Sequence, residues 1–437
     1  MSSLRREVRA EDLSRGRRIF LLILVSMGSS IIYTPAYLKN VFYDPLMEGL
    51  HTTNAGLGQL LSAYAITATI CYLPSGIVAD KIRVRTLGWV GFCSTAALTL
   101  VYAMLPSFGT LMVVFVGMGI TTILIWWGIR YKLVRLISTE EEYPRNIGLS
   151  YGVYGAAGLI VNLVSLWIVN SVFAGRLVAG VRGLLIFLAV VIAILGVLSF
   201  LFIPRFEGEI NKSASGFDFR GILEALKNPV VWISAACMFF VYFYYTGVNY
   251  TTPYLSDVMG ASLGVVSVVS IVRTYGVTLL SGPVFGSVAK SIGSPSKAII
   301  GGSLLVAVGL ISFAYLPSTT AMAIVAAIIV MLLGFIANGV FGVVSSQLTE
   351  GKVPMSVFGT ATGLLSVVGF LPDTFSSTWF GSLIDANGND AYVQIFWILA
   401  GTAVIAALLA LVLIVYVRRN AARLETVQEI VAEQAEG

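Results

Sequence analysis

Residues 76–85 read Gly-Ile-Val-Ala-Asp-Lys-Ile-Arg-Val-Arg and separate two long apolar segments. The stretch starts with a glycine, places an aspartate four residues later, and then carries three cations within five positions. A loop that only connects two hydrophobic segments has no need of this spacing of a glycine, an aspartate and three cations. The spacing therefore indicates a defined charge cluster. The composition of the chain around it shows what kind of protein carries the cluster.

The composition is typical of a polytopic helical membrane protein. Of 437 residues, 57% are hydrophobic and 11% are charged, and the mean hydropathy is +0.90. A water-soluble protein could not bury that much apolar surface. The apolar runs are continuous over about 20 residues, whereas barrel strands alternate apolar and polar positions, which excludes a β-barrel. Three scattered cysteines, Cys71, Cys93 and Cys237, have no pairing or ligand spacing, so we expect no disulfide and no metal site.

Twelve apolar runs are long enough to cross a bilayer, and the polar connection 204–228 divides them into six and six. Two equal halves suggest repeated bundles with a solute site at mid-membrane between them. We therefore expect an all-α membrane protein with twelve transmembrane helices in two six-helix bundles. The expected runs are 19–43, 56–79, 86–105, 110–136, 146–173, 181–203, 229–255, 263–289, 298–316, 320–347, 357–384 and 391–417. The expected parts are an N-terminus (1–18), a first bundle (19–203), a linker (204–228), a second bundle (229–417) and a tail (418–437).

The distribution of Lys and Arg predicts the orientation. Of 27 such residues, 23 fall in the N-terminus, the even-numbered connections and the C-terminus. Lys39, Arg176 and Arg182 fall on the other side. Because cytoplasmic loops carry the excess of positive charge, both termini should be cytoplasmic in a multi-pass plasma (inner) membrane protein. The net charge of +5 reflects this topology, so no nucleic-acid partner is expected. Arg130 and Lys132, near the inner end of the fourth run, are interpreted as anchors.

Arg273 is the most informative single residue. It lies eleven residues into the run 263–289. A charged residue at the centre of a membrane helix costs about 2.5–3.5 kcal/mol of insertion free energy on translocon-based scales, which give the lowest values. One interpretation is anion binding by the guanidinium fork, and the other is a structural ion pair with Asp373. Asp373 is the only acidic residue deep within a predicted span. It could carry a proton for symport, or it could neutralise Arg273.

Further candidates for solute binding are polar aromatic residues in the first, fourth and seventh runs. Hydroxyl and indole groups suit sugar or phosphate oxygens, although Tyr and Trp also form belts at the membrane interfaces. Lys39, near the outer part of the first run, either contacts the solute or snorkels to the outer interface. The predicted solute-binding set is Arg273, Lys39, Tyr33, Tyr37, Trp126 and Tyr245.

The charge cluster resembles the signature between helices 2 and 3 of the major facilitator superfamily (MFS), roughly Gly-x-Leu-Ala-Asp-Arg-x-Gly-Arg-Arg. Gly76, Asp80, Lys81 and Arg85 match it, whereas Arg83 stands where the family has its second glycine. The resemblance implies a gating role for the four matching residues. Asp80 would face the start of helix 11 and its dipole, and the cluster would latch the two halves during a rocking, alternating-access cycle.

A narrower resemblance is to the organophosphate:phosphate antiporter branch, the sugar-phosphate permeases. That branch carries a basic residue followed by Asn in helix 1, as Lys39-Asn40 does, and a Gly-Met-Gly in helix 4, as residues 117–119 do. Its helix 11 is similar to residues 359–371. The chain departs from it in two ways. Helix 7 lacks the second binding arginine, which is replaced by Arg273 in helix 8, and the only histidine is His51, in a loop.

These observations predict a secondary transporter that moves a small organic anion, a sugar phosphate or related solute, by alternating access. The alternatives are a proton-coupled symporter of a neutral sugar or carboxylate and, from another class, a membrane sensor or an intramembrane enzyme. An enzyme is disfavoured because no nucleophile–base pair, metal cluster or phosphate-cradling loop is visible. The expected partners are the solute, the bilayer and either protons or phosphate as coupling ion, with no cofactor and a monomeric state.

Overall fold

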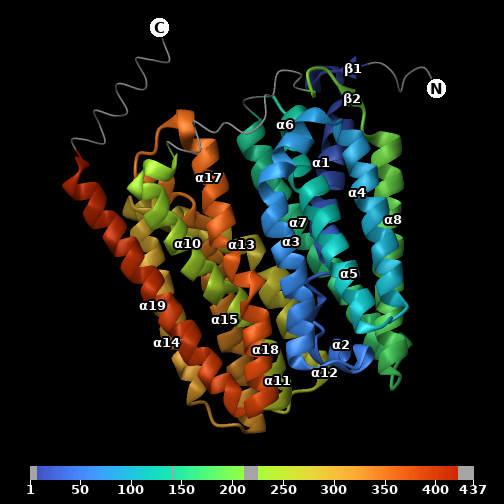
Figure 1. The fold of residues 1–437 in the computed structure, drawn as a ribbon, viewed down its shortest axis with the longest axis vertical. Coiled ribbons are helices and arrows are strands. Elements are labelled where there is room, and N and C mark those ends of the chain that lie inside the picture. The colour runs from blue at the N-terminus through green and yellow to red at the C-terminus, as the bar shows by residue number, and fades with distance from the viewer. Residues whose placement is uncertain (1–6, 140–141, 211–224, 422–437) are drawn as a thin grey trace. The chain divides into compact units, whose positions relative to one another are not determined.

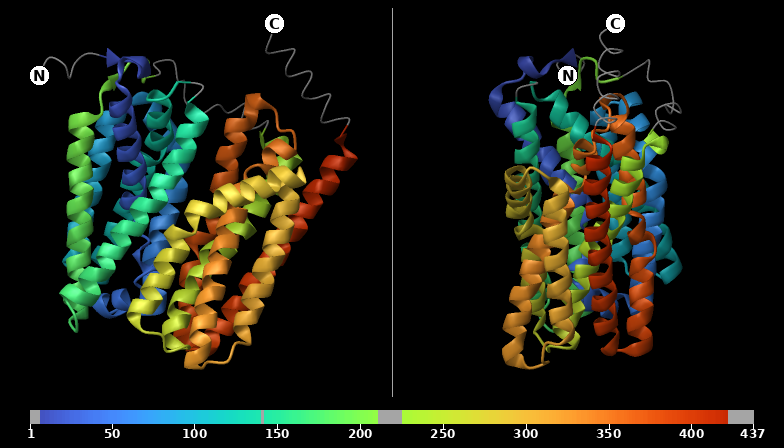
Figure 2. Two further views of the ribbon diagram at one scale, coloured as in Figure 1. Left: turned by 180° about the vertical axis from the view of Figure 1, so that it is seen from behind. Right: turned by 90° about the vertical axis from the view of Figure 1, so that its left-hand side faces the viewer.

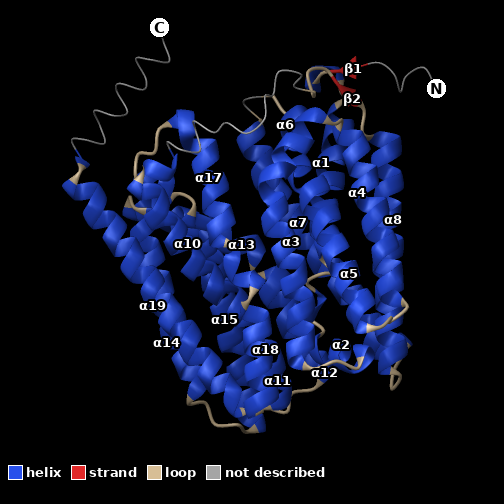
Figure 3. Cartoon of the chain, in the orientation of Figure 1, coloured by secondary structure: helices blue, strands red, loops and turns tan. Residues whose placement is uncertain are grey.

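The computed structural model describes residues 7–139, 142–210 and 225–421. Contacts divide the chain into two compact units, Met1–Gly216 with Leu263–Ile271, and Phe217–Ser262 with Val272–Gly437. Both units are helical (Figures 1 and 3). The strands among the described residues are β1 (Glu7–Val8) and β2 (Arg205–Phe206), which pair in parallel. The start of the predicted N-terminus, the middle of the linker and most of the tail lie outside the described residues.

The first unit is built on long helices, in which α1 packs on α7, α3 on α5, and α4 on α8 (Figure 2, blue to green). Its helices are α1 (Arg15–Tyr33), α2 (Tyr43–Leu50), α3 (Asn54–Lys81), α4 (Val84–Ala103), α5 (Phe108–Gly119), α6 (Gly128–Leu136), α7 (Tyr143–Trp167), α8 (Leu177–Phe202) and α12 (Leu263–Ile271). Two π-helical segments, Ile120–Trp127 and Ile168–Val172, continue α5 into α6 and extend α7.

The second unit is organised around α10, which packs on α15, α17 and α19, while α14 packs on α15 and α19. Its helices are α10 (Pro229–Gly247), α11 (Thr251–Asp257), α13 (Thr278–Ile292), α14 (Pro295–Ala314), α15 (Thr320–Val344), α16 (Gln347–Glu350), α17 (Met355–Gly369), α18 (Ser376–Asn387) and α19 (Asp390–Arg419).

The spans of the described residues agree roughly with the twelve predicted. Ten continuous helical stretches are long and apolar enough to cross a membrane, and Leu263–Gly276 with Thr278–Ile292 forms an eleventh that bends by 44°. The predicted run 357–384 is divided into α17, a 3-10 turn (Leu371–Thr374) and α18. An interrupted backbone within a membrane is tolerated where the surrounding protein satisfies its polar groups.

The first span differs from its prediction. Helix α1 ends at Tyr33, although the apolar run continues to residue 43. Pro35 comes two residues after this end and cannot continue a helix, because it lacks an N–H donor. The chain then makes a 3-10 turn (Leu38–Asn40) before α2, so Lys39 lies outside the first helix. Hydropathy detects burial in an apolar medium but not the continuity of a helix, which explains the error.

The helix surfaces separate close protein contacts from lipid contacts. At Gly196 on α8 an added Cβ would lie 2.7 Å from Cys93 Sγ on α4, so a small residue permits this approach. Large apolar side chains elsewhere are openly exposed, among them Ile70 (69%), Val113 (70%) and Ile324 (69%). Apolar exposure on this scale has an explanation in a bilayer but not in water.

Candidate functional site

The polar centre of the second unit is Arg273, and its backbone is irregular. Residues Val272–Gly276 form a π-helical turn, in which the Val277 N–H donates to the Val272 carbonyl at 2.8 Å. The turn lies just before the 44° bend of this span. Such turns insert an extra residue into a helix and occur frequently at functional sites. Arg273 is buried, with 3% of its surface exposed, so protein atoms surround its side chain.

A row of neutral oxygens from the segment after α10 holds the guanidinium. Nη1 donates to Thr251 Oγ1 at 3.1 Å and to Thr252 Oγ1 at 3.0 Å. Nη2 donates to Asn249 Oδ1 at 2.7 Å. On the facing helix α15, Gly334 leaves room for the side chain, because an added Cβ would collide with Arg273 Cγ. Hydroxyl and amide dipoles solvate the guanidinium at these contacts without cancelling its positive charge.

A second polar group of the same unit contains the predicted acid. Asp373, 4% exposed, accepts a hydrogen bond from the Tyr242 hydroxyl at 2.7 Å. Tyr245, one turn further along α10, is half-buried and stacks on Phe341 with ring centroids 4.7 Å apart. The contacts named here for Asp373 and for Arg273 involve different neighbours, and the ion pair between the two stays a prediction.

In the first unit, the predicted residues lie where α1 ends. The half-buried Tyr33 donates to the Thr122 carbonyl at 3.4 Å and meets Trp127 edge-on at 6.5 Å between centroids. Tyr37 packs edge-on against Tyr64 at 5.4 Å. Lys39 is 6% exposed, so protein atoms surround nearly all of its side chain.

Trp126 does not suit the role predicted for it. It is fully buried, its indole N–H donates to Ser29 Oγ at 3.2 Å, and its ring packs on Phe92. These contacts leave no face for a solute, so Trp126 is a core residue of the first unit. Its half-buried neighbour Trp127 contacts Tyr33, and also Tyr72 at 5.1 Å and Tyr131 at 6.1 Å.

Sequence reasoning missed Arg130, which it treated as an interfacial anchor. Arg130 is only 8% exposed and is surrounded by tyrosines of α6 and α7. The signal available in the sequence was its position six residues before the end of α6 at Leu136, about 9 Å of helix. A charge at that depth is better explained by burial than by anchoring.

The charge cluster at 76–85 makes its described contacts within the first unit. Gly76 is exposed and has room for a Cβ, so no close contact within the described residues requires a glycine there. Asp80 lies 3.9 Å from Lys132 Nζ, which also donates to the Ala79 carbonyl. The guanidinium of Arg85 covers the Phe200 ring at 4.6 Å, so its partner is aromatic.

Arg83, the residue that departs from the family signature, joins three segments of the first unit. It pairs with Glu209 at 2.8 Å and with Glu7 at 2.7 Å. Glu7 belongs to β1, and Glu209 follows β2, so the two strands labelled in Figure 1 hold both carboxylates beside Arg83. Glu209 is 2% exposed, and burial raises the pKa of its carboxyl above the ordinary value, although Arg83 opposes the shift. We call this group the β clasp.

We expect Arg83→Ala to destabilise the first unit by about 1–3 kcal/mol, because it leaves a buried carboxylate without its cation. Glu209→Gln in the same background should recover most of the loss.

The pH dependence gives a second test. A carboxyl whose folded pKa is raised favours the folded state at low pH, and this contribution is lost as the pH rises through the folded pKa. The damage from Arg83→Ala should therefore be smaller near pH 4.5 than near neutral pH. Apparent melting temperature in detergent measures both effects.

The matched control is Arg9→Ala. Arg9 forms a bidentate pair with Glu207 at 2.6 and 2.8 Å in the same clasp, but both side chains are more than half exposed. Exposed pairs contribute about 0–1 kcal/mol. Equal melting temperatures for the Arg83 and Arg9 variants would contradict a structural role for the buried pair.

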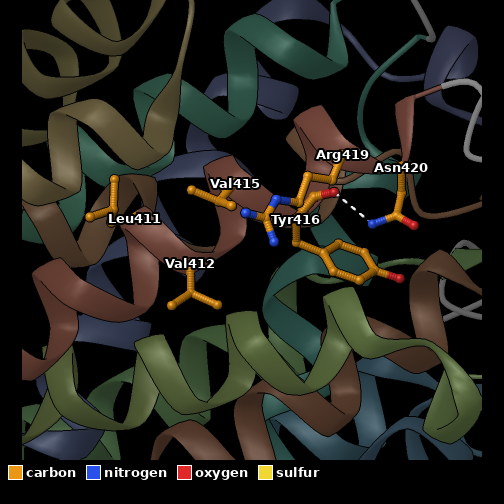
Figure 4. Close-up of a pocket in the computed structure, with 6 residues that line it drawn as sticks. All are labelled: Leu411, Val412, Val415, Tyr416, Arg419 and Asn420. Atoms are coloured by element: carbon orange, nitrogen blue, oxygen red, sulfur yellow. Dashed lines mark hydrogen bonds between the residues drawn. The ribbon is translucent and has the colours of Figure 1, made fainter.

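A hollow of about 460 Å³ lies along the last turns of α19 (Figure 4). Leu411, Val412, Val415, Tyr416, Arg419 and Asn420 line it. None of the predicted solute-binding residues lies there, and its lining is mainly apolar. It is therefore separate from the polar groups described above.

Comparison with known proteins shows the family. The model of the Major Facilitator Superfamily matches residues 19–377, which is most of the chain. The chain belongs to the Major Facilitator Superfamily. It is a multi-pass membrane transporter and not an enzyme, as the sequence predicted.

Relatives within the superfamily are distant. Inner membrane protein YqcE of Escherichia coli K12 is 27% identical over 370 residues, covering 82% of this chain and 85% of YqcE. A variant of the nucleoside transporter NupG superposes with a TM-score of 0.72 at 17% identity, covering 91% and 99% of the two chains. A bacterial homologue of the human lysosomal transporter Spinster gives 0.71 at 15% identity, covering 92% and 97%. At these identities the solved structures show the shared MFS fold and nothing about the solute.

Proposed function

We propose that this MFS protein is a secondary transporter of a small organic anion and that Arg273 binds the anionic group. The observation that carries the proposal is a guanidinium with 3% exposure in the middle of a membrane span. Ionisable residues at such positions are costly and usually mark a solute or ion pathway. The planar fork of an arginine suits carboxylate and phosphate oxygens, which it can bind in bidentate geometry.

A sugar phosphate is the first solute to test. The motifs shared with the organophosphate:phosphate antiporter branch support it. Tyr33, Tyr37 and Tyr245 are proposed to contribute hydroxyl groups to its binding. Lys39 is the proposed second cation for the anionic group. Phosphate would then serve as the exchanged ion.

The proposed cycle is alternating access in a monomer of the inner membrane with both termini in the cytoplasm. The excess of Lys and Arg in the even-numbered connections and at the termini supports this orientation. Gly76, Asp80, Lys81 and Arg85 are proposed to gate the cytoplasmic side. The name of the relative YqcE, an inner membrane protein, supports the location.

The second candidate is a proton-coupled symporter of a neutral sugar, nucleoside or carboxylate. A specific contact favours it, since the buried Asp373 accepts from the Tyr242 hydroxyl, an arrangement that could hold a coupling proton. The fold neighbour NupG is a nucleoside transporter, which makes nucleosides a reasonable comparison class.

Proteoliposomes separate the two candidates. Counterflow with sugar phosphates, phosphate, dicarboxylates, neutral sugars and uridine identifies the solute class, and an imposed pH gradient tests proton coupling. We expect exchange of an anion that needs no pH gradient, with Asp373→Asn retaining exchange. Uptake of a neutral solute that requires the gradient and disappears in Asp373→Asn would favour the symporter and overturn the anion proposal.

A further inference from the structure

Arg130 is the centre of an aromatic cluster within the first unit. Its guanidinium carbon lies 4.5 Å from the Tyr151 ring centroid, 5.1 Å from that of Tyr154 and 5.6 Å from that of Tyr131. Arg130 comes from α6, and Tyr151 and Tyr154 come from adjacent turns of α7. We call these four residues the Arg130 cage. Cation–π contacts hold a guanidinium by the faces of the rings, which leaves its in-plane N–H groups available to a ligand.

The hydrogen bonds of Arg130 are incomplete. Nη2 donates to Ser150 Oγ at a long 3.3 Å, and Nε is buried without a hydrogen-bond partner among the described residues. No carboxylate of the described residues forms an ion pair with Arg130. A buried cation with an unsatisfied donor is expensive to maintain unless a ligand completes its shell.

The cage connects to the residues already considered for solute binding. Trp127 meets Tyr131 at 6.1 Å and Tyr33 at 6.5 Å between ring centroids. These rings are partly exposed rather than sealed in the core. The cage therefore borders a partly exposed aromatic surface of the first unit, which includes Tyr151 at 45% exposure.

We propose that the Arg130 cage is an oxyanion-binding subsite of the first unit, which takes a carboxylate or phosphate group of the transported solute. The unsatisfied Nε–H of Arg130 and the other N–H groups in the plane of its guanidinium suit the oxygens of such a group. The inference rests on the proposed anion transport for the identity of the ligand. Its structural basis lies wholly in the first unit and is independent of Arg273.

The test uses purified protein in nanodiscs of phosphatidylcholine, which carry no net lipid charge. All variants carry Arg273→Gln, so that the second unit contributes nothing to the signal. Thermal stabilisation by inorganic phosphate, a hexose phosphate and succinate is titrated against chloride at equal ionic strength. We expect saturable stabilisation, and Arg130→Gln should raise the apparent dissociation constant about tenfold to a hundredfold. Arg130→Lys should give a smaller loss.

The control is Arg135→Gln, which removes an exposed cation from the same helix α6 and should leave the titration unchanged. If Arg130→Gln fails to fold, two other measurements test the proposal. One is the titration of Arg130→Lys. The other is an anion-dependent change in Trp127 fluorescence, which is assigned to Trp127 by its loss in Trp127→Phe. The proposal is wrong if chloride stabilises as well as the oxyanions, or if Arg130→Gln and Arg130→Lys both keep the wild-type affinity. A signal that appears only when phosphatidylglycerol is added would assign the cage to a lipid headgroup instead. A failure of Arg273→Gln to impair transport would refute the proposed function without affecting this titration.

Discussion

Arg273→Gln should lower uptake of the anionic solute about a hundredfold or more in proteoliposomes. A neutral amide keeps part of the volume and polarity but loses two or more charge-assisted hydrogen bonds to the solute, each about 1.5–3 kcal/mol. A total of about 3 kcal/mol corresponds to two orders of magnitude in binding. Because glutamine can still donate to the oxygens of Thr251 and Asn249, the variant should fold and insert normally. Initial rates of radiolabelled solute uptake measure the loss.

Two controls make this result specific. Arg273→Lys keeps the charge but not the planar fork, so it should retain part of the uptake. Lys290→Gln removes an exposed cation from α13, the helix that follows Arg273 in the same span, and should leave the rate unchanged. Full uptake of every transported solute by Arg273→Gln would rule out the anion-binding role.

Gly334→Ala should impair transport without altering any charged group. A methyl group at this position would collide with Arg273 Cγ and would lie 3.3 Å from its backbone oxygen. The arginine must then leave its row of oxygens at Asn249, Thr251 and Thr252, or α15 must shift. Overpacking of this kind costs about 1–3 kcal/mol. We expect uptake to fall about tenfold to a hundredfold, with only a moderate loss of melting temperature.

Gly301→Ala is the matched control for that variant, because nothing lies within 4 Å of an added Cβ at this position on α14. It should transport and melt like the wild type. Normal uptake by Gly334→Ala would show that the observed position of Arg273 is unimportant for transport. A common defect in both variants would point instead to a general loss of helix packing.

The sequence predicted the fold well because hydropathy and charge bias act over whole spans. The helical class follows from sums over about 20 residues each, which single irregularities barely change. Local backbone geometry is a different matter. The end of α1 at Tyr33 and the π-helical turn at Arg273 depend on which neighbours satisfy individual carbonyls, and a hydropathy window carries no such information.

The candidate site was predictable only where a residue is anomalous by itself. A charge eleven residues into a span, as for Arg273, is visible in the sequence because its cost depends on depth alone. Arg130 was interpreted as an anchor because two of the three rings around it come from another helix, α7, which the local sequence does not show. Trp126 was misjudged for the reverse reason, since an indole has the same sequence pattern whether it faces a solute or packs on Phe92.

The β clasp shows a similar limit. Arg83 looked like a defect in the MFS signature, but its partners Glu7 and Glu209 are separated by about half the chain, and two-residue strands have no detectable pattern. A match to the family signature does not by itself establish the role of a residue. Gly76 has free space around it, so its gating role rests on the resemblance and is open to test by Gly76→Ala.

The most direct measurement is a structure of the protein with its preferred transported anion bound. We expect an oxygen of the anionic group within about 3 Å of an N–H nitrogen of Arg273. Loss of that density in Gly334→Ala should accompany its transport defect. A bound solute that leaves every guanidinium contact of Arg273 unchanged, or an Arg273 that points toward lipid headgroups, would contradict its role in anion transport.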